Sequence, residues 1–261
     1  MAKVIAVANQ KGGCSKTSVA ANLGIGLAMA GKKICLIDGD PQGSLTVSLG
    51  YPDPDEIPLT LATIMMDIIN EEDFPIDCGM LHHEEGVDLV PANMELSGLE
   101  VSLSNVMSRE MILKEYVDML CDHYDYILID CMPSLGVMTI NALVAADRVL
   151  IPNQAAYLPV KGLQQLIKTI SVVKKRLNKG LSIEGILITM VDYRTNYAKD
   201  ITAMLKESYG MSVGVMESFI PFSVKVAEAS AEGISIYCYA PRCKVTESFE
   251  RLTREVLENE E

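Results

Sequence analysis

Short apolar runs alternate with longer amphipathic stretches along most of the 261-residue chain. The runs are nearly continuous in Val, Ile and Leu, which is typical of parallel strands covered by helices on both faces. This alternation predicts an α/β fold with a mostly parallel, twisted central sheet. We expect strands over residues 4–8, 33–38, 87–90, 126–130, 148–152, 185–190 and 214–220. We expect helices over residues 16–30, 59–70, 108–122, 137–146, 160–177, 195–209 and 245–258.

The spacing of these elements predicts a single domain over residues 1–261, with no separate DNA-binding module before the first strand. Two acidic segments, residues 51–58 and 71–86, are interpreted as surface loops because the alternation resumes directly after each. The N-terminus lacks the apolar block of a signal peptide, and no stretch approaches the ~20 apolar residues of a membrane span. We therefore expect a cytoplasmic protein without membrane contact.

Charge is distributed unevenly along the chain, whose formal net charge is −13. Residues 1–150 carry 8 basic and 22 acidic side chains, a net charge of −14, whereas residues 151–261 carry 14 and 13, a net charge of +1. This balance argues against general affinity for nucleic acid and predicts that any polyanion contact lies on the C-terminal half. A simpler alternative is that the N-terminal acids only solvate surface helices.

The seven cysteines are scattered and form no Cys-x-x-Cys pair. In a chain without an export signal, this spacing predicts reduced thiols and small core residues rather than disulfides or a zinc site.

The strongest motif is residues 9–18, which follow the first predicted strand and open the first predicted helix. A loop in this position presents successive backbone N–H groups and a helix N-terminus to an anion, which is how proteins bind phosphate. Lys16 is expected to reach the β- and γ-phosphates of ATP, and the Thr17 hydroxyl to ligate Mg²⁺. The predicted nucleotide-binding residues in this loop are Lys11, Gly12, Gly13, Cys14, Ser15, Lys16, Thr17 and Ser18.

The loop departs from the ordinary P-loop pattern, since Ser15 stands where that pattern has the glycine before its lysine, and Lys11 adds a second lysine. The resulting Lys-Gly-Gly-x-x-Lys-Thr resembles the deviant Walker A motif of the ParA/MinD family of P-loop ATPases. The resemblance implies that Lys11 reaches across a dimer interface to the partner's nucleotide. Ser15 leaves two alternatives open: it strains or crowds the loop and weakens turnover, or its hydroxyl adds a hydrogen-bond donor.

Two further segments place carboxylates at the ends of predicted strands, the edge where open α/β sheets bind ligands. Residues 38–43 resemble the family's Asp-x-Asp-Pro-Gln-Gly. The resemblance implies that Asp40 positions or deprotonates the attacking water and that Asp38 shapes the Mg²⁺ shell. Alternatively, Asp40 only initiates a turn. The strand ending at Asp130 resembles a Walker B motif, which implies that Asp130 holds Mg²⁺ through water. The predicted metal residues are Thr17, Asp38 and Asp130, and the predicted catalytic residues are Lys11, Lys16 and Asp40.

Later segments of the chain indicate which members of the family it resembles most. Residues 131–136 resemble the family's switch loop, and residues 185–196 and 220–229 resemble late ParA segments, which implies that Pro221 contacts adenine through its backbone. The acidic end, residues 255–261, differs from the basic membrane-binding helix of MinD-type proteins. The whole chain is therefore most similar to ParA/Soj partition ATPases.

This resemblance implies that ATP closes a homodimer, that the dimer binds nonspecific nucleoid DNA, and that a ParB-like centromere-binding protein stimulates hydrolysis to move a plasmid, mobile element or chromosome. The family's two arginines after Ile220-Pro221 are replaced by Phe222 and Lys225. A rival hypothesis is therefore a hydrolysis-poor, nucleotide-gated switch that recruits a protein partner without DNA.

Six basic residues remain as candidate DNA contacts: Arg194, Lys225, Arg242, Lys244, Arg251 and Arg254. A second basic cluster, residues 174–179, has an equally simple explanation, because basic side chains commonly stabilise a helix C-terminus before a glycine.

Overall fold

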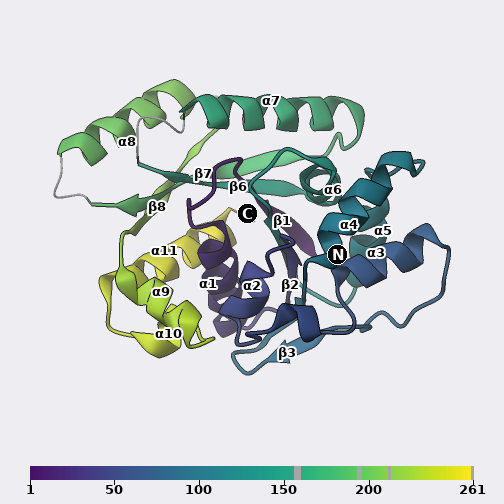
Figure 1. Cartoon of the computed structure of the whole chain (residues 1–261). Coiled ribbons are helices and arrows are strands. Elements are labelled where there is room, and N and C mark those ends of the chain that lie inside the picture. The colour runs from purple at the N-terminus through teal and green to yellow at the C-terminus, as the bar shows by residue number, and fades with distance from the viewer. Residues whose placement is uncertain (156–159, 193–195, 211–212, 260–261) are drawn as a thin grey trace.

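An eight-stranded sheet runs through the computed structural model, which describes residues 1–155, 160–192, 196–210 and 213–259 (Figure 1). Its strand order is β3-β4-β2-β5-β1-β6-β7-β8, and every pairing is parallel except that of β3 with β4. This confirms the predicted fold class. The strands are β1 (Lys3–Val7), β2 (Ile34–Gly39), β3 (Leu81–His83), β4 (Val87–Val90), β5 (Tyr126–Cys131), β6 (Arg148–Gln154), β7 (Ser182–Val191) and β8 (Val215–Pro221).

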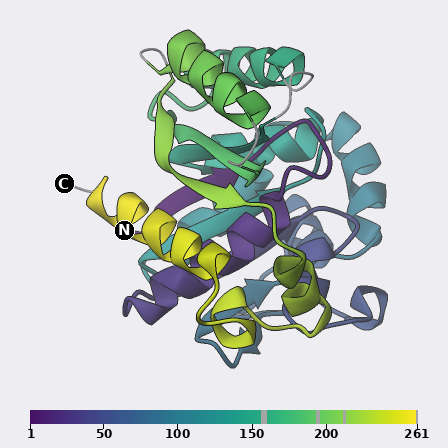
Figure 2. The ribbon, with the colours of Figure 1, turned by 90° about the vertical axis from the view of Figure 1, so that its left-hand side faces the viewer.

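Helices cover both faces of the sheet, as Figures 1 and 2 show from two directions. One face carries α1 (Lys16–Met29), α2 (Ser44–Ser48), α9 (Val224–Ala231), α10 (Ile236–Tyr239) and α11 (Lys244–Glu258). The other carries α3 (Leu61–Ile69), α4 (Glu95–Ser102), α5 (Ile112–Leu120), α6 (Val137–Ala145), α7 (Val160–Arg176) and α8 (Asn196–Tyr209). Two short 3-10 helices, Pro54–Glu56 and Leu103–Asn105, complete the described elements.

Alternate residues of each central strand enter two separate cores. In β1, Val4 and Ala6 pack under α5 and α6, whereas Ile5 and Val7 pack under α1 and α11. Because both faces of the strand are covered, each position favours an apolar side chain. This double burial explains why the strands appear in the sequence as continuous apolar runs. The strand order places β1 near the centre of the sheet.

The differences from the predicted elements involve short or polar segments. Residues 71–86 are not entirely a loop, because β3 lies within them and pairs antiparallel with β4 at the sheet edge. The strand has only three residues, two of them histidines, so it has no apolar run to reveal it. Residues 51–58 contain a 3-10 turn. The helices α2, α4, α9 and α10 were missed because four to eight residues are too few for a clear helical period.

The contact between α1 and the C-terminal helices is close. The Asn22 Oδ1 atom accepts a hydrogen bond of 2.8 Å from the backbone N–H of Ile236. One turn further along α1, a Cβ atom on Gly26 would overlap the hydroxyl groups of Thr253 and Tyr237. Glycine at position 26 therefore sets how closely α1, α10 and α11 can pack.

We expect the substitution Gly26→Ala to lower the free energy of unfolding by about 1–3 kcal/mol, because the added methyl overpacks a buried contact. Chemical denaturation measures this change. The matched control is Gly162→Ala in α7, where a Cβ atom has nothing within 4 Å and the higher helix propensity of alanine favours the fold. Equal stability of the two variants would contradict the packing argument.

Candidate functional site

The loop between β1 and α1 is anchored at several points. The Asn9 side chain donates 2.7 Å to the Pro152 carbonyl and accepts 3.0 Å from the Lys11 N–H, and the Thr189 hydroxyl donates 3.1 Å to the Cys14 carbonyl. These contacts hold the loop against the ends of β6 and β7. A Cβ atom on either of the glycines 12 and 13 would meet nothing within 4 Å. The loop therefore forms an open cradle of backbone N–H groups in front of a helix N-terminus, the arrangement that binds phosphate.

Two lysines lie at this cradle. Lys16, the first residue of α1, is only 7% exposed, and its ammonium group donates 3.3 Å to the Lys11 carbonyl. The Lys11 ammonium group lies 3.3 Å from the Gln154 Oε1 atom, at the end of β6. Burying an ammonium group beside a neutral oxygen is costly, and an anion in the cradle would compensate for it. The two charges and the helix dipole therefore favour a polyanionic ligand.

Two buried carboxylates lie opposite each other on β2 and β5, because Asp38 pairs in register with Asp130. The Thr17 hydroxyl donates 2.6 Å to Asp130 Oδ2, whereas Asp130 Oδ1 is buried and makes no hydrogen bond within the described structure. Burial, reinforced by the charge of Asp38, raises the pKa of Asp130 to about 8, and burial raises the pKa of Asp38 to about 6. A cation at this point would favour the ionised carboxylates.

Oxygen ligands of this kind suit Mg²⁺, which keeps several waters and needs one or two carboxylates besides the phosphates. Within the described residues, no group of three or more His, Cys, Asp or Glu side chains is arranged to hold a metal by itself. The hydroxyl of Thr17 and the free oxygen of Asp130 therefore fit a magnesium ion that is bound together with a nucleotide.

Asp38 is held by hydrogen bonds at both of its carboxylate oxygens. Its Oδ2 atom accepts hydrogen bonds of 2.9 Å from the Thr46 N–H and 2.8 Å from the Thr46 hydroxyl, and its Oδ1 atom accepts 3.2 Å from the Asp40 N–H. The Thr46 hydroxyl in turn accepts from the Ala92 N–H. Asp38 therefore ties the loop after β2 to α2 and to the end of β4.

Asp40 lies half-buried on this loop. Its Oδ1 atom accepts 3.0 Å from the Gln42 N–H, and its Oδ2 atom makes no hydrogen bond among the described residues. The turn that the sequence left open as an alternative does form. It leaves one carboxylate oxygen available at the same edge of the sheet as the phosphate loop.

A mostly apolar pocket of about 190 Å³ adjoins the phosphate loop. Ser15 and Ser18 form the wall nearest the loop, and Pro221 lies on the opposite strand. The sequence-predicted base contact at Pro221 is thus brought next to the predicted phosphate site. The remaining lining residues are Met190, Ile220, Phe222, Ser223, Val224, Val226, Ala227 and Phe249.

Several residues around the loop were missed by the sequence analysis. Buried oxygens without a hydrogen-bond partner in the described structure occur on Gln10 and Asn153 as well as on Asp130. Asn9 and Thr189 anchor the loop, and Gln154 contacts Lys11. Apart from Gln10, which lies within the loop, these are polar residues near the carboxyl ends of β1, β6 and β7. A polar residue that ends an apolar run was the signal that could have found them.

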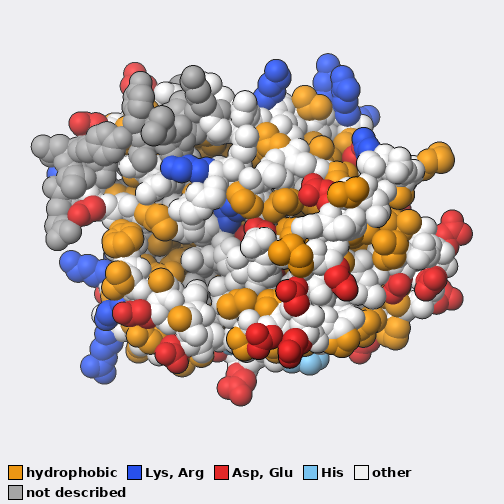
Figure 3. Space-filling model, viewed as in Figure 1, with side chains coloured by type: hydrophobic (Ala, Val, Ile, Leu, Met, Phe, Trp, Pro, Cys, Tyr) orange, Lys and Arg blue, Asp and Glu red, His pale blue; other side chains and the backbone are white. Residues whose placement is uncertain are grey.

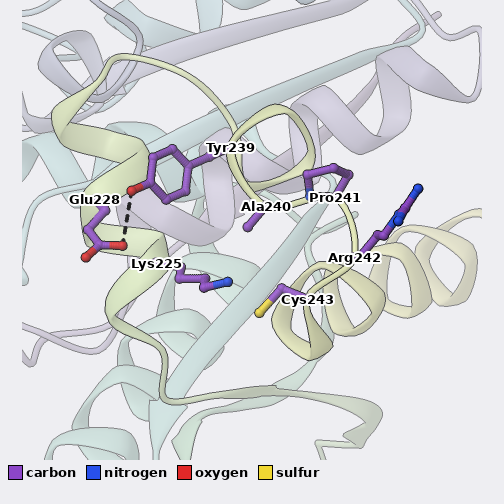
Figure 4. A pocket seen from close by; sticks show the side chains of 7 residues that line it. All are labelled: Lys225, Glu228, Tyr239, Ala240, Pro241, Arg242 and Cys243. Atoms are coloured by element: carbon purple, nitrogen blue, oxygen red, sulfur yellow. Dashed lines mark hydrogen bonds between the residues drawn. The ribbon is translucent and has the colours of Figure 1, made fainter.

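The basic residues fall into separate groups. Lys225 and Arg242 line a hollow of about 430 Å³ between α9 and α11 (Figure 4), and Lys244 and Arg251 line an adjacent hollow of about 660 Å³. Arg254 follows on the exposed surface of α11, and Arg194 lies outside the described residues. Figure 3 shows acidic side chains gathered at the lower right, where α3 and β3 lie, with Lys and Arg towards the upper and left margins.

The basic residues 174–179 lie elsewhere. They occupy the last turn of α7 and the residues that follow it, and the Asn178 side chain between them donates to the carbonyls of Leu143, Val144 and Ala146. Those carbonyls precede β6, so this cluster lies at the sheet edge opposite the phosphate loop. This position, at the C-terminus of α7, matches the alternative in which the basic residues stabilise a helix end.

The parallel sheet, the loop before α1 and the carboxylate ending β5 define a P-loop NTPase. The family model described as "AAA domain" matches residues 2–183. The sporulation initiation inhibitor protein Soj of Bacillus subtilis is 40% identical over 259 residues, which covers 99% of this chain and 100% of Soj. The chromosome partitioning protein ParA of Caulobacter vibrioides is 35% identical over 260 residues, which covers 99% and 95%. The chain belongs to the ParA/Soj family of chromosome-partitioning ATPases.

A solved structure with a bound nucleotide shares this fold. The structure described as cobyrinic acid a,c-diamide synthase from Mycobacterium smegmatis, with bound ATP analogue and magnesium, has a TM-score of 0.88 and 32% sequence identity. The match covers 100% of this chain and 96% of the chain in that structure. The prediction of an ATPase is confirmed. No helix within the described residues has both the length and the apolar character needed to cross a bilayer.

Ser15 occupies the left-handed region, with φ 70° and ψ 25°, so its backbone is strained as one of the two alternatives foresaw. We expect Ser15→Gly to raise the free energy of unfolding by up to about 1 kcal/mol. Glycine removes the ~1–2 kcal/mol cost of the left-handed backbone conformation, but it also increases the conformational entropy of the unfolded chain, which offsets part of the gain. Chemical denaturation measures the change. Ser18→Gly, within α1, is the control and should destabilise. A loss of stability in Ser15→Gly would show that the serine hydroxyl outweighs the strain.

Proposed function

We propose that this chain is an ATP-driven partition switch, in which nucleotide-dependent dimerisation controls binding to DNA and to a partner protein. The observation that carries the proposal is the convergence of Lys16, Thr17, Asp130 and Asp40 at one edge of the sheet. Buried charge, an unpartnered carboxylate oxygen and an open backbone cradle there form a site suited to a magnesium nucleotide. The names of the relatives, which refer to chromosome partitioning, support the biological setting.

The residues take distinct roles in this proposal. The loop N–H groups and Lys16 bind the β- and γ-phosphates, while Thr17 and Asp130 hold Mg²⁺. When bound, Mg²⁺ neutralises phosphate charge that builds up in the transition state. Asp40 uses its available oxygen to orient the attacking water, and Asp38 fixes the Asp40 loop through its hydrogen bond with the Asp40 N–H. Catalysis then comes from positioning and charge stabilisation.

Lys11 is the proposed contact to a second copy of the chain. Its ammonium group lies 3.3 Å from an uncharged amide oxygen, that of Gln154. That contact is easily exchanged for a stronger, charge-assisted bond to a phosphate. In the proposed homodimer, Lys11 leaves Gln154 and stabilises the nucleotide of the partner.

The DNA contacts are proposed to lie on the basic surface formed by α9 and α11. Lys225 and Arg242 line one hollow (Figure 4), and Lys244 and Arg251 line the next. Each hollow is also lined by one acid: Glu228 accepts a 3.2 Å hydrogen bond from Tyr239, and Glu247 pairs with Arg251 at 3.8 Å. With Arg254, these residues form a modest, salt-sensitive phosphate-binding surface. Arg194 stays a prediction from the sequence.

The proposed partner is a ParB-like centromere-binding protein that stimulates hydrolysis, and the proposed location is the cytoplasm, in association with the nucleoid. A second candidate function has specific support. The strained φ of Ser15 and the net charge of −13 favour a slowly hydrolysing switch that recruits a protein without DNA. ATP-dependent retention on DNA distinguishes the two functions.

Two variants test the nucleotide site. Lys16→Ala should abolish binding of Mg·ATP, because it removes the buried ammonium group from the phosphate cradle. Asp40→Ala should bind Mg·ATP with little change and lose turnover at least tenfold, because a group that orients water acts mainly in the transition state. Calorimetry measures binding, and phosphate release measures turnover. Unchanged ATP affinity in Lys16→Ala would contradict the proposed nucleotide site, and wild-type turnover in Asp40→Ala would show that Asp40 has no part in the mechanism.

Salt dependence tests the DNA surface. The ATP-bound protein should bind nonspecific duplex DNA, with log affinity falling linearly in log salt by about 0.9 per neutralised phosphate. Lys225→Ala and Arg242→Ala should each lower that slope by about 0.9 without changing ATP affinity. Lys179→Ala, an exposed lysine near the opposite sheet edge, is the matched control and should change neither quantity. A dimer that forms with ATP yet is never retained on DNA at low salt would favour the protein-recruiting switch.

A further inference from the structure

We propose that Phe222 stacks on the base of the bound nucleotide and is a determinant of nucleotide affinity in this chain. The inference rests on the proposed nucleotide site at the phosphate loop and adds a residue to it. Phe222 directly follows β8 and lines the apolar pocket that adjoins Ser15 and Ser18. Phe222 therefore borders the compartment next to the cradle, as well as the hollow that Lys244 and Arg251 line. A nucleotide held by its phosphates would place its base in the first of these.

The backbone around this pocket supports a ligand-binding role. The described residues include four non-glycine residues with positive φ: Ser15, Glu71, Ser108 and Met190. Two of these, Ser15 and Met190, line this one pocket from different elements. Backbone strain tends to be retained at functional sites. The coincidence of two such residues in one pocket next to the phosphate loop is evidence independent of Phe222 itself.

The exposure of Phe222 is unusual for a phenylalanine. Its side chain is 65% exposed, while its backbone N–H is fixed by a 3.2 Å hydrogen bond to the Val191 carbonyl. A rigidly anchored backbone that presents a large apolar ring at the rim of a pocket can cover a planar ligand with little loss of entropy. Stacking of a base on an aromatic side chain typically contributes ~1–3 kcal/mol.

The chemistry of the pocket indicates which part of the base is recognised. Its polar side chains are the hydroxyls of Ser15, Ser18 and Ser223, and its lining contains no charged or amide side chain. Such a pocket reads the face of a base much more strongly than its edge, because discrimination between edges requires matched hydrogen-bonding groups. Phe222 should therefore contribute equally to the binding of different purine nucleotides and nothing to the binding of their phosphates.

Calorimetry on the full chain with three probes, Mg·ATP, Mg·GTP and Mg·tripolyphosphate, tests this inference. Phe222→Ala should weaken ATP and GTP by the same factor, about tenfold, and leave tripolyphosphate unchanged. Phe222→Tyr should retain wild-type affinities. Val101→Ala in α4 is the matched control, because Val101 is an equally exposed apolar residue (73%) that does not line the pocket. Unchanged ATP affinity in Phe222→Ala overturns the inference, as does an equal loss for all three probes, which would indicate a distorted loop.

A second readout does not depend on affinity. The chain contains ten tyrosines but no tryptophan, so Phe222→Trp introduces a single tryptophan whose emission is distinguishable from that of the tyrosines. Its emission should change on saturation with ATP or GTP and stay constant with tripolyphosphate. Constant emission at saturating ATP would overturn the inference. Failure of the wild-type chain to bind any of the probes would instead refute the proposed nucleotide site, so the two failures are distinguishable.

Discussion

Buried charge at the centre of the sheet is the constraint on which the rest of this structure depends. Asp38 and Asp130 face each other on neighbouring strands, and Lys16 is buried close by at the start of α1. Burial raises the pKa of both carboxyl groups, and the charge of Asp38 raises that of Asp130 further. A ligand that brings both a cation and an anion would complement Asp130 and Lys16, and a magnesium nucleotide is such a ligand.

The scaffold keeps these charges in place through contacts between distant parts of the chain. Asn9 reaches β6, Thr189 reaches the loop from β7, and Thr46 holds Asp38 from α2. The same region borders the C-terminal helices, because the pocket beside Ser15 is closed by residues of β8 and α9. The nucleotide site and the basic surface of α9 and α11 are thus adjacent. Such proximity is what a switch needs if nucleotide state is to alter the binding of a polyanion.

Much of the fold and part of the site were predictable from the sequence, and the reasons are physical. Strands buried on both faces need apolar side chains at every position, so the runs ending at Val7 and Asp130 were recognisable. Helices such as α5 and α11 have enough turns to show a period. The strand β3 and the helices α2 and α9 do not, since they are short or polar. The phosphate loop was recognisable because it is local, with all its backbone donors in one stretch of chain.

By itself, the sequence determined the longer strands and helices, the phosphate loop and the identity of the carboxylates, because each depends on neighbouring residues. Only the tertiary structure decided which polar residues meet. Pairing of β2 with β5 sets Asp38 against Asp130, and the end of β6 brings Gln154 to Lys11. Phe222 appears in the sequence only as the replacement of a family arginine. Because β8 and α9 pack beside the loop, it lines a pocket in the structure. These contacts join residues that are far apart in the chain. No local sequence pattern predicts them, because the residues come close to one another only when the chain folds.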